Sequence, residues 1–285
     1  MLGKGANGEA WLAFKRDYIS QEPDFSDKYV IKKVPLGNQP VLSKSDKLRE
    51  IQLLAMIRHP YIVTYDDCWI EDGTLFVVME FAGGGTMEKY CDKGTPVIPL
   101  QLLYDSFVQA MLAVAYLHER RIVHRDLKPA NVFVLDDNSV KLGDLGEGWI
   151  THGDQKGSAQ ERWANDPAQK GQLVGTPYYL APECWMGTST DLDKADVWAM
   201  GVLLYELCTK SRPFVGRSVQ HLAVNACKQD VPFPSGETAG TLKGYPDDAL
   251  EEVVKLMLEK KPDRRPTCRE VLAYPCVANV LLMCC

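Results

Sequence analysis

One eight-residue stretch constrains this chain more than any other: His124-Arg125-Asp126-Leu127-Lys128-Pro129-Ala130-Asn131. It lies between an apolar run with helical spacing at 107–117 and a short apolar run at 132–135, so we expect a loop that joins a helix to a strand. The loop holds a carboxylate, an ammonium and an amide. Phosphoryl transfer needs a group that orients the attacking hydroxyl, a cation near the moving phosphate and an oxygen ligand for Mg²⁺. The alternative is a solvated charged turn, and an Asp144-Leu145-Gly146 that follows shortly afterwards argues against it.

Composition sets broad limits on what the chain can do. Its 285 residues suffice for one large domain or two lobes. Charged residues make up 25% and hydrophobic residues 46%, as in ordinary globular proteins. A net charge of −6 provides no overall basic field for nucleic acid or anionic membrane, so we expect no nucleic-acid partner. Any phosphate site must therefore be built locally.

Cysteine usage and the termini suggest a location. The nine cysteines are scattered, odd in number and without a CxxC pair, which favours reduced thiols over structural zinc and predicts a cytoplasmic protein with possible access to the nucleus. We expect no signal peptide, because the start is Gly-rich and polar. We expect no transmembrane segment, because no uninterrupted apolar run reaches 18 residues. The residues carry no signal for the oligomeric state.

The N-terminal glycines have two possible interpretations. Gly3, Gly5 and Gly8 form a GxGxxG pattern, which serves either a dinucleotide-binding turn or a hairpin that closes over phosphates. The first needs a strand before it and a helix after it, whereas here the chain begins at the motif and residues 10–14 have no helical period. We therefore favour the hairpin, with glycines freeing backbone N–H groups for phosphate. The polar run 15–28 predicts a long solvent loop.

The next elements complete a small, mostly β lobe. Alternating β-branched residues predict a strand over 29–34, with Val30 and Lys32 on one face and Ile31 and Lys33 on the other. One lysine of this strand could hold phosphates with its ammonium group. The alternative is that Lys32 and Lys33 are both ordinary surface residues. Apolar spacing predicts a helix over 43–58 that carries Glu50 and ends at His59-Pro60. Strands are expected over 62–70 and 74–79.

A Gly-rich joint at 80–85 separates this N-lobe, residues 1–79, from a mostly helical C-lobe, residues 86–285. The class is α+β. In the C-lobe we expect strands at 132–135 and 140–142, a polar, Gly-rich stretch at 146–175, and helices at 100–118, 195–207, 218–228, 247–259 and 267–281. Asp196 begins a nearly all-apolar helix and should be a buried, hydrogen-bonded carboxylate.

Over essentially its whole length the chain resembles eukaryotic-type serine/threonine protein kinases. The serine/threonine type rests on Lys128-Pro129 and Gly175-Thr176-Pro177, and the strings at 29–32 and 175–183 look most like the NIMA-related branch. The resemblance implies a bilobal kinase fold, ATP and Mg²⁺ as cofactors, and protein substrates with Ser or Thr acceptors. It implies a nucleotide site built from Leu2, Gly3, Gly5, Gly8, Ala10, Val30, Lys32, Met79, Glu80 and Ala82.

The same resemblance implies the catalytic roles. Lys32 would hold the α- and β-phosphates and pair with Glu50. Asp126 would orient the substrate hydroxyl, and Lys128 would contact the γ-phosphate. The metal ligands would be Asn131 and Asp144.

Residues 144–183 resemble an activation segment, whose Glu183 would pair with Arg265. In the family Arg125 binds a phosphate on this segment, but no Ser, Thr or Tyr lies between residues 159 and 175. We therefore hypothesise that this site does not switch the protein by phosphorylation. Glu161 or Asp166 could supply the negative charge, or Ser158 could be phosphorylated at a shifted position.

Further departures from the family pattern leave other functions open. Ala10 and Val30 exchange the usual valine and alanine, which conserves volume. Leu145 replaces the phenylalanine of the metal motif, and almost no strand precedes the glycines, so the first strand is shortened or the sequence truncated. We expect an active serine/threonine kinase. The alternatives are a pseudokinase that binds ATP as a scaffold and, last, a small-molecule kinase of related fold.

Overall fold

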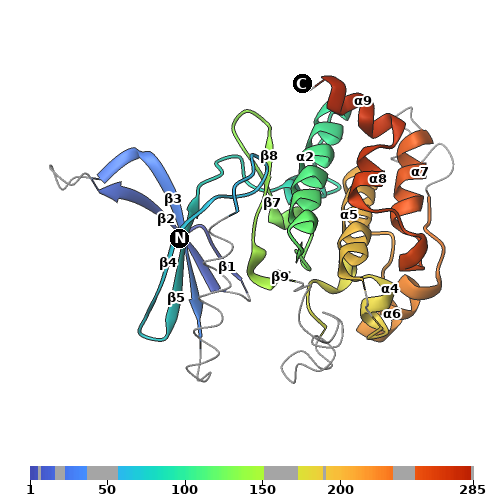
Figure 1. The fold of residues 1–285 in the computed structure, drawn as a ribbon, viewed down its shortest axis with the longest axis horizontal. Coiled ribbons are helices and arrows are strands. Elements are labelled where there is room, and N and C mark those ends of the chain that lie inside the picture. Colours follow the sequence, from blue (N-terminus) through green and yellow to red (C-terminus); the bar gives the residue numbers. More distant parts are fainter. Residues whose placement is uncertain are drawn as a thin grey trace. The chain divides into compact units, whose positions relative to one another are not determined.

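A computed structural model of the chain describes residues 1–5, 8–16, 23–36, 57–150, 173–188, 191–233 and 248–283. Contacts between Cα atoms divide it into two compact units, Met1–Gly83 and Gly84–Cys285, and the boundary falls within the segment 80–85 (Figure 1). Where the structure describes them, the first unit is built on a sheet and the second is mostly helical. The α+β class predicted from the sequence is confirmed.

The first unit is built on one antiparallel sheet in the order β1-β2-β3-β5-β4. Its strands are β1 (Gly3–Gly5), β2 (Gly8–Arg16), β3 (Pro23–Pro35), β4 (Tyr65–Glu71) and β5 (Thr74–Glu80). Along β5, buried Leu75, Val77 and Met79 alternate with partly exposed residues, so one face of the sheet is apolar and covered. The strands β4 and β5 are joined at Asp72 and Gly73, whose φ angles of 46° and 71° suit a two-residue hairpin turn.

The solvent loop predicted over 15–28 is wrong where the structure describes it. The strand β2 continues to Arg16 and β3 begins at Pro23, because the ladder resumes after a register shift between Phe14 and Lys15. Backbone pairing does not require apolar side chains, and proline is tolerated at the first position of a strand. The strand β4 also begins at Tyr65, later than predicted. Most of the helix predicted over 43–58, namely residues 43–56, lies outside the described residues.

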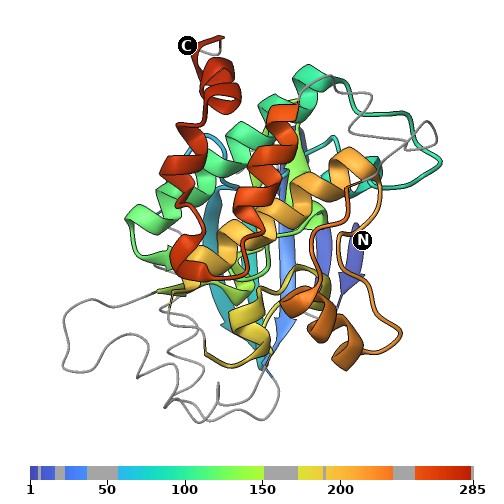
Figure 2. The ribbon, with the colours of Figure 1, turned by 90° about the vertical axis from the view of Figure 1, so that its right-hand side faces the viewer.

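The second unit begins with short elements and the first long helix: η1 (Met87–Tyr90), α2 (Leu100–Glu119), β6 (Ile122–Val123), η2 (Pro129–Asn131), β7 (Val132–Val134), β8 (Val140–Leu142), η3 (Leu145–Glu147) and β9 (Trp149–Ile150). It continues with η4 (Pro177–Tyr179), α4 (Pro182–Trp185), α5 (Leu192–Thr209), α6 (Val219–Lys228), α7 (Asp248–Met257), η6 (Pro262–Arg264), α8 (Cys268–Leu272) and α9 (Pro275–Met283). The helices α2, α5, α7 and α8 lie side by side (Figure 2).

The helix α5 is the core of this unit. Every residue from Asp196 to Thr209 is buried, and α5 packs against α2 and α7. Gly201 lets α7 approach, since a Cβ there would lie 2.9 Å from the Cβ of Met257. The apolar pattern therefore predicted a buried helix correctly. The single helix predicted over 267–281 is wrong, because it divides into α8 and α9 before Pro275, which cannot continue a helix.

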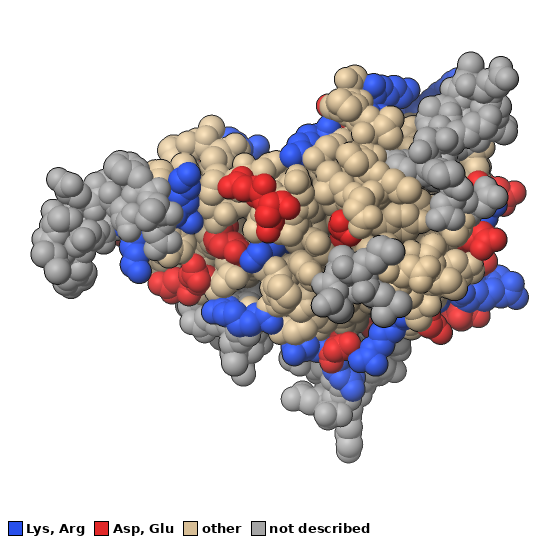
Figure 3. All heavy atoms as spheres, turned by 90° about the horizontal axis from the view of Figure 1, so that it is seen from above, with Lys and Arg blue, Asp and Glu red and all other residues tan. Residues whose placement is uncertain are grey.

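Two properties bear on possible partners: the hydropathy of the helices and the distribution of surface charge. Among the described residues, α2 is the one helix long and apolar enough to cross a membrane, and 61% of its apolar window is buried inside the protein. Its contacts with α5, α8 and α9 are those of a core helix, which passes the same test. Basic and acidic side chains are interspersed on the face shown in Figure 3.

Candidate active site

The loop 124–131 is held by a carboxylate from the core helix. Asp196, at the N-terminal end of α5, accepts hydrogen bonds from the backbone N–H groups of His124 and Arg125 at 2.8 and 2.9 Å. Its Oδ2 also lies 2.9 Å from the Nε2 atom of His118 on α2. The prediction that Asp196 is buried and hydrogen-bonded is confirmed. One side chain thus joins two helices to the backbone of the loop.

The charges of this pair support each other. Burial disfavours the charged form of His118, but hydrogen bonds with Asp196 and with the thiol of Cys268 outweigh it and raise the pKa of His118 well above its usual range. Burial likewise opposes ionisation of Asp196, and the hydrogen bond and charge of His118 hold its pKa below the ordinary value. The loop is therefore anchored on a buried imidazolium–carboxylate pair.

The carboxylate of Asp126 lies at the centre of the site. Oδ2 accepts hydrogen bonds from Lys128 Nζ at 2.7 Å and from Asn131 Nδ2 at 3.1 Å. Oδ1 accepts from the backbone N–H of Thr176 at 3.0 Å and from its hydroxyl at 2.7 Å. Lys128 Nζ also donates to Thr176 Oγ1 at 2.8 Å. The three polar groups predicted from the sequence are brought together, and they are fixed before any substrate arrives.

Gly175 allows Thr176 to reach this carboxylate. Its φ is 102°, and a Cβ at this position would lie 2.5 Å from the carbonyl oxygen of Arg125, so a larger residue would force the two segments apart. Thr176 was recognised in the sequence as part of a motif and received no role. Its contact with Asp126 spans 50 positions of sequence, and a single sequence offers no signal for such a contact.

The predicted metal ligands Asn131 and Asp144 lie at one end of the β7–β8 hairpin. Val132 pairs with Leu142, and the N–H of Gly143 donates to the carbonyl of Asn131 at 2.9 Å. Asp144 follows at once, with a left-handed φ of 56°. An amide and a carboxylate supply the hard oxygen donors that suit Mg²⁺, which usually takes one or two protein ligands and completes its shell with water and phosphate.

The first unit gathers four of the predicted nucleotide-site residues on one face of its sheet. Register pairs Ala10 with Lys32 and Lys32 with Val77, while Val30 pairs with Met79. Directly paired residues share a face, so Ala10, Val30, Lys32 and buried Met79 lie together there. The opposite face carries Lys33 over the rings of Trp11 and Phe76. The predicted division of Lys32 and Lys33 between two faces is confirmed.

The glycines and the end of β5 account for the other predicted residues of this unit. Gly3 and Gly5 pair with Ala10 and Gly8 in the β1–β2 hairpin, and the N–H of exposed Leu2 donates to Ala10 O. A Cβ at Gly8 would lie 2.1 Å from Lys33 O, so the close strand pairing requires glycine. At the end of β5, Glu80 is fixed by two hydrogen bonds with the backbone of Thr64, and Ala82 follows. Glu50 lies outside the described residues.

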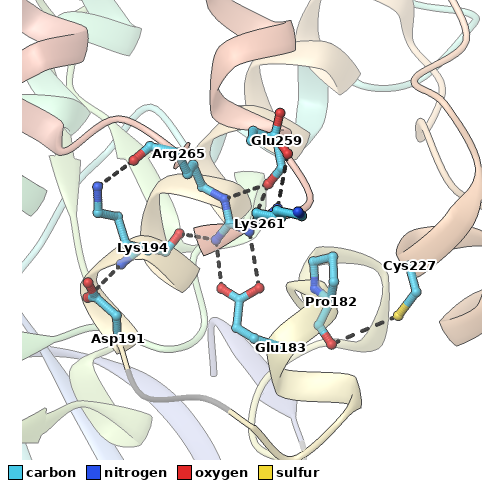
Figure 4. A network of polar contacts seen from close by, with 8 residues as sticks. All are labelled: Pro182, Glu183, Asp191, Lys194, Cys227, Glu259, Lys261 and Arg265. Carbon is cyan, nitrogen blue, oxygen red and sulfur yellow. Dashed lines mark hydrogen bonds and ion pairs between the residues drawn. The ribbon is translucent and has the colours of Figure 1, made fainter. Parts of the chain in front are cut away.

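A second buried ion pair holds the segment that ends at Glu183. Its two oxygens accept from Arg265 at 2.7 and 3.1 Å, and both side chains are almost fully buried (Figure 4). Arg265 also donates to the carbonyl groups of Lys194 and Glu259, which places it between α4, α5 and the turn after α7. The predicted pairing of Glu183 with Arg265 is confirmed.

Arg125 contacts an aromatic ring. Its guanidinium lies 5.8 Å from the ring centroid of Trp149 on β9, the strand that pairs with β6. Trp149 is not predicted from the sequence, because a two-residue strand has no detectable pattern. Residues 151–172, and with them Ser158, Glu161 and Asp166, lie outside the described residues.

Comparison with known proteins agrees with this geometry. A family model described as the protein kinase domain matches residues 1–277. The chain belongs to the protein kinase family. The predicted bilobal kinase fold is thereby confirmed.

Curated relatives of this kinase domain are named Nek kinases. It is 33% identical over 284 residues to the serine/threonine-protein kinase Nek4 of Mus musculus, covering 98% of this chain and 32% of the relative. It is 30% identical over 282 residues to Nek5 of Homo sapiens, covering 98% and 36%. With Nek3 of Oryza sativa subsp. japonica it shares 31% over 276 residues, covering 96% and 42%. The resemblance to the NIMA-related branch is confirmed, and the chain spans about a third to two fifths of these three relatives.

Proposed function

We propose that this kinase domain is catalytically active and transfers the γ-phosphate of ATP to Ser or Thr hydroxyls of protein substrates. The observation that carries the proposal is the Asp126 carboxylate, held by Lys128, Asn131 and Thr176. A scaffold without catalysis would not need a carboxylate with four donors aimed at it. The relatives, all named serine/threonine-protein kinases, support the same acceptor class.

In this proposal each residue has a defined task. Asp126 accepts a hydrogen bond from the substrate hydroxyl and places its oxygen in line with the phosphorus atom. Lys128 carries positive charge to the oxygens of the transferring group. Lys32 and the backbone of the β1–β2 hairpin hold the ATP phosphates. Asn131 and Asp144 would hold Mg²⁺, which would supply positive charge to offset that of the phosphate oxygens.

The test is transfer of labelled phosphate from ATP to a generic protein substrate in the presence of Mg²⁺. Asp126→Asn should lower transfer by about 10²- to 10⁴-fold, as expected for loss of a positioned proton acceptor. Asp137→Asn, in an exposed turn, is the matched control and should leave transfer unchanged. Retained ATP binding without transfer in the wild type would instead support the pseudokinase alternative.

We also propose that the protein acts in the cytoplasm, with access to the nucleus. The seven cysteines that the structure describes are all free thiols, which suits a reducing compartment. Fluorescence microscopy of the full-length protein with a fused reporter tests this location. Retention in a secretory compartment would contradict it.

A further inference from the structure

A cysteine, a histidine and an aspartate lie in direct contact next to the loop 124–131. The Sγ atom of Cys268 lies 3.5 Å from Nδ1 of His118, and the other ring nitrogen of His118 lies 2.9 Å from Oδ2 of Asp196. Asp196 in turn accepts hydrogen bonds from two backbone N–H groups of the loop. Three contacts in series therefore connect a thiol to the loop that carries Asp126.

Cys268 is buried but lies close to the surface. It is the first residue of α8 and is 3% exposed, whereas its neighbours in sequence, Thr267 and Arg269, are exposed. Arg269 pairs with Glu119 across α8 and α2, one position after each member of the Cys268–His118 contact. Exposed ion pairs of this kind are weak. A molecule as small as hydrogen peroxide therefore needs only a local opening at this end of α8 to reach the sulfur.

The charged neighbour of Cys268 distinguishes it from another buried cysteine. Because the pKa of His118 is raised well above its usual range, its ring is positively charged at neutral pH. A positive charge beside a sulfur favours the thiolate, which is the reactive form. Cys208 on α5 is buried to the same extent, at 4% exposed, and burial alone raises its pKa to about 12. The two thiols differ in their surroundings rather than in their exposure.

We propose that Cys268 is a site of reversible oxidation by peroxide, and that its oxidation is transmitted to the loop 124–131 through His118 and Asp196. The oxidation site does not depend on the proposed kinase function, whereas its effect on phosphate transfer does. The site lies outside the residues to which the proposed function assigns a task.

The reaction is a two-electron oxidation of the sulfur. The sulfur of Cys268 attacks one oxygen of hydrogen peroxide, so that an S–O bond forms while the O–O bond breaks, and the peroxide takes two electrons from the sulfur. The thiol proton goes to the departing hydroxide, which leaves as water, and the product is a sulfenic acid. Two equivalents of a thiol reductant reverse the step: the sulfenic acid returns to the thiol, the reductant becomes a disulfide, and the oxygen leaves as water.

The added oxygen disturbs the contact that the thiol makes. Because Cys268 is buried, the oxygen has to lie against buried neighbours, and a packed interior accommodates an extra atom only by displacing them. The ring of His118 touches the sulfur, and a shift of this ring takes it away from Asp196. A buried carboxylate that loses its cationic partner is strongly destabilised. Oxidation should therefore weaken the hold of Asp196 on the loop 124–131.

The first experiment measures where the protein is oxidised. The wild type is exposed to hydrogen peroxide with dimedone, which traps sulfenic acid, and peptide mass spectrometry gives the labelling rate at each cysteine. Cys268 should be labelled at least about tenfold faster than Cys208, the matched buried control. Arg269→Ala, which removes the surface ion pair, should raise the rate at Cys268 about two- to fivefold and leave Cys208 unchanged. Equal labelling of Cys268 and Cys208 in the wild type would overturn the site.

The second experiment measures the transmission without phosphate transfer. Hydrogen exchange of the backbone N–H groups of His124 and Arg125, followed by NMR spectroscopy, reports on the groups that Asp196 holds. Their exchange should become about 10- to 100-fold faster in the oxidised protein, the effect of losing a hydrogen bond to a charged group, and dithiothreitol should reverse the change. Cys268→Ser and Cys268→Ala should both remove the response to peroxide, so the result does not depend on how one substitution is tolerated.

Phosphate transfer by the wild type should fall with oxidation of Cys268 and recover with dithiothreitol. An oxidised Cys268 with unchanged exchange at both amides would overturn the transmission. If the exchange responds to peroxide but the protein transfers no phosphate under any condition, the oxidation site stands and the proposed kinase function fails.

Discussion

The two units position their candidate residues by different physical means. In the first unit, Ala10, Val30, Lys32 and Met79 come together because strand register places them on one face. In the second, Asp126 is fixed by Lys128 and Asn131 of its own loop and by the distant Thr176, and the loop is held through Asp196. Register is a repeated backbone pattern, whereas the second arrangement depends on a few buried charged groups.

This difference teaches where the protein is sensitive to substitution. Each ladder hydrogen bond is one of many, so a single side chain in the sheet contributes little to the placement of its neighbours. A buried charge that loses its partner costs far more, because no water replaces the lost contact. Single substitutions should therefore act strongly in the polar network of the second unit and weakly on the sheet of the first.

The largest effect is expected at the Glu183–Arg265 pair. Arg265→Ala leaves a buried carboxylate without its partner and should lower the free energy of unfolding by about 3–5 kcal/mol. The matched control is Arg269→Ala, since Arg269 pairs with Glu119 on the surface, where the two side chains are 77% and 45% exposed. That change should cost about 0–1 kcal/mol. Urea denaturation compares the two, and equal losses would contradict the contrast between buried and exposed pairs.

Thr176 tests whether the Asp126 carboxylate depends on its neighbours. Thr176→Val removes the hydroxyl that bonds Asp126 and Lys128 but keeps the backbone N–H bond. We expect kcat/KM to fall about 10- to 100-fold, the loss of one hydrogen bond to a charged group. Thr176→Ser should retain most activity. A Val variant with wild-type kcat/KM would show that the hydroxyl does not position the carboxylate.

His118 gives the network a pH dependence with a definite sign. Because folding raises its pKa, its charge stabilises the folded state fully below the ordinary pKa of 6.5, and that stabilisation is lost as the pH rises through the raised value. His118→Gln keeps a donor near Asp196 and removes the charge, so we expect a loss of about 1 kcal/mol at pH 6. The difference from wild type should shrink at alkaline pH. Two carboxyl groups also face His118: Asp196, whose pKa is lowered, and Asp193, whose pKa is raised by burial. If both stay ionised over this pH range, the stability difference between wild type and His118→Gln follows a single titration.

Denaturation at several pH values from 6 to 10 measures this difference. Cys268, which contacts Nδ1 of His118, is controlled by repeating the series with Cys268→Ser. A gap between wild type and His118→Gln that widens with rising pH would contradict the assigned sign.

Much of the architecture was predictable because it follows from periodic patterns. Alternation located the strand around Lys32, and a nearly unbroken apolar run located α5. The predictions were wrong where the pattern of side-chain polarity does not determine the backbone structure. Polar Asp24 and Lys28 join the ladder through their backbone, and Pro275 divides what the apolar spacing presents as one helix. Neither outcome is encoded in side-chain polarity.

The candidate site was likewise predictable only in part. Motif spacing identified Asp126, Lys128 and Asn131, and the structure brings their side chains together. The partners Thr176 and Trp149 were not assigned roles, because they reach the loop across long stretches of sequence. Contacts of this kind depend on how the chain returns to the loop, which composition and periodicity do not specify.

The smallest effect is expected on the exposed face of the sheet, where Lys33 lies 5.0 Å from the ring of Trp11 and 5.7 Å from that of Phe76. Lys33→Met should destabilise β2 and β3 by about 0.5–1 kcal/mol, the range of exposed cation–π contacts. Hydrogen exchange of the amides in β2 and β3 reports this local stability. A cycle with Trp11→Leu isolates the pair, since the two losses should not add if the ring and the ammonium interact. Additive losses of stability would show that the ammonium of Lys33 and the ring of Trp11 do not interact. A loss for Lys33→Met as large as that for Arg265→Ala would contradict the difference in sensitivity between the two units.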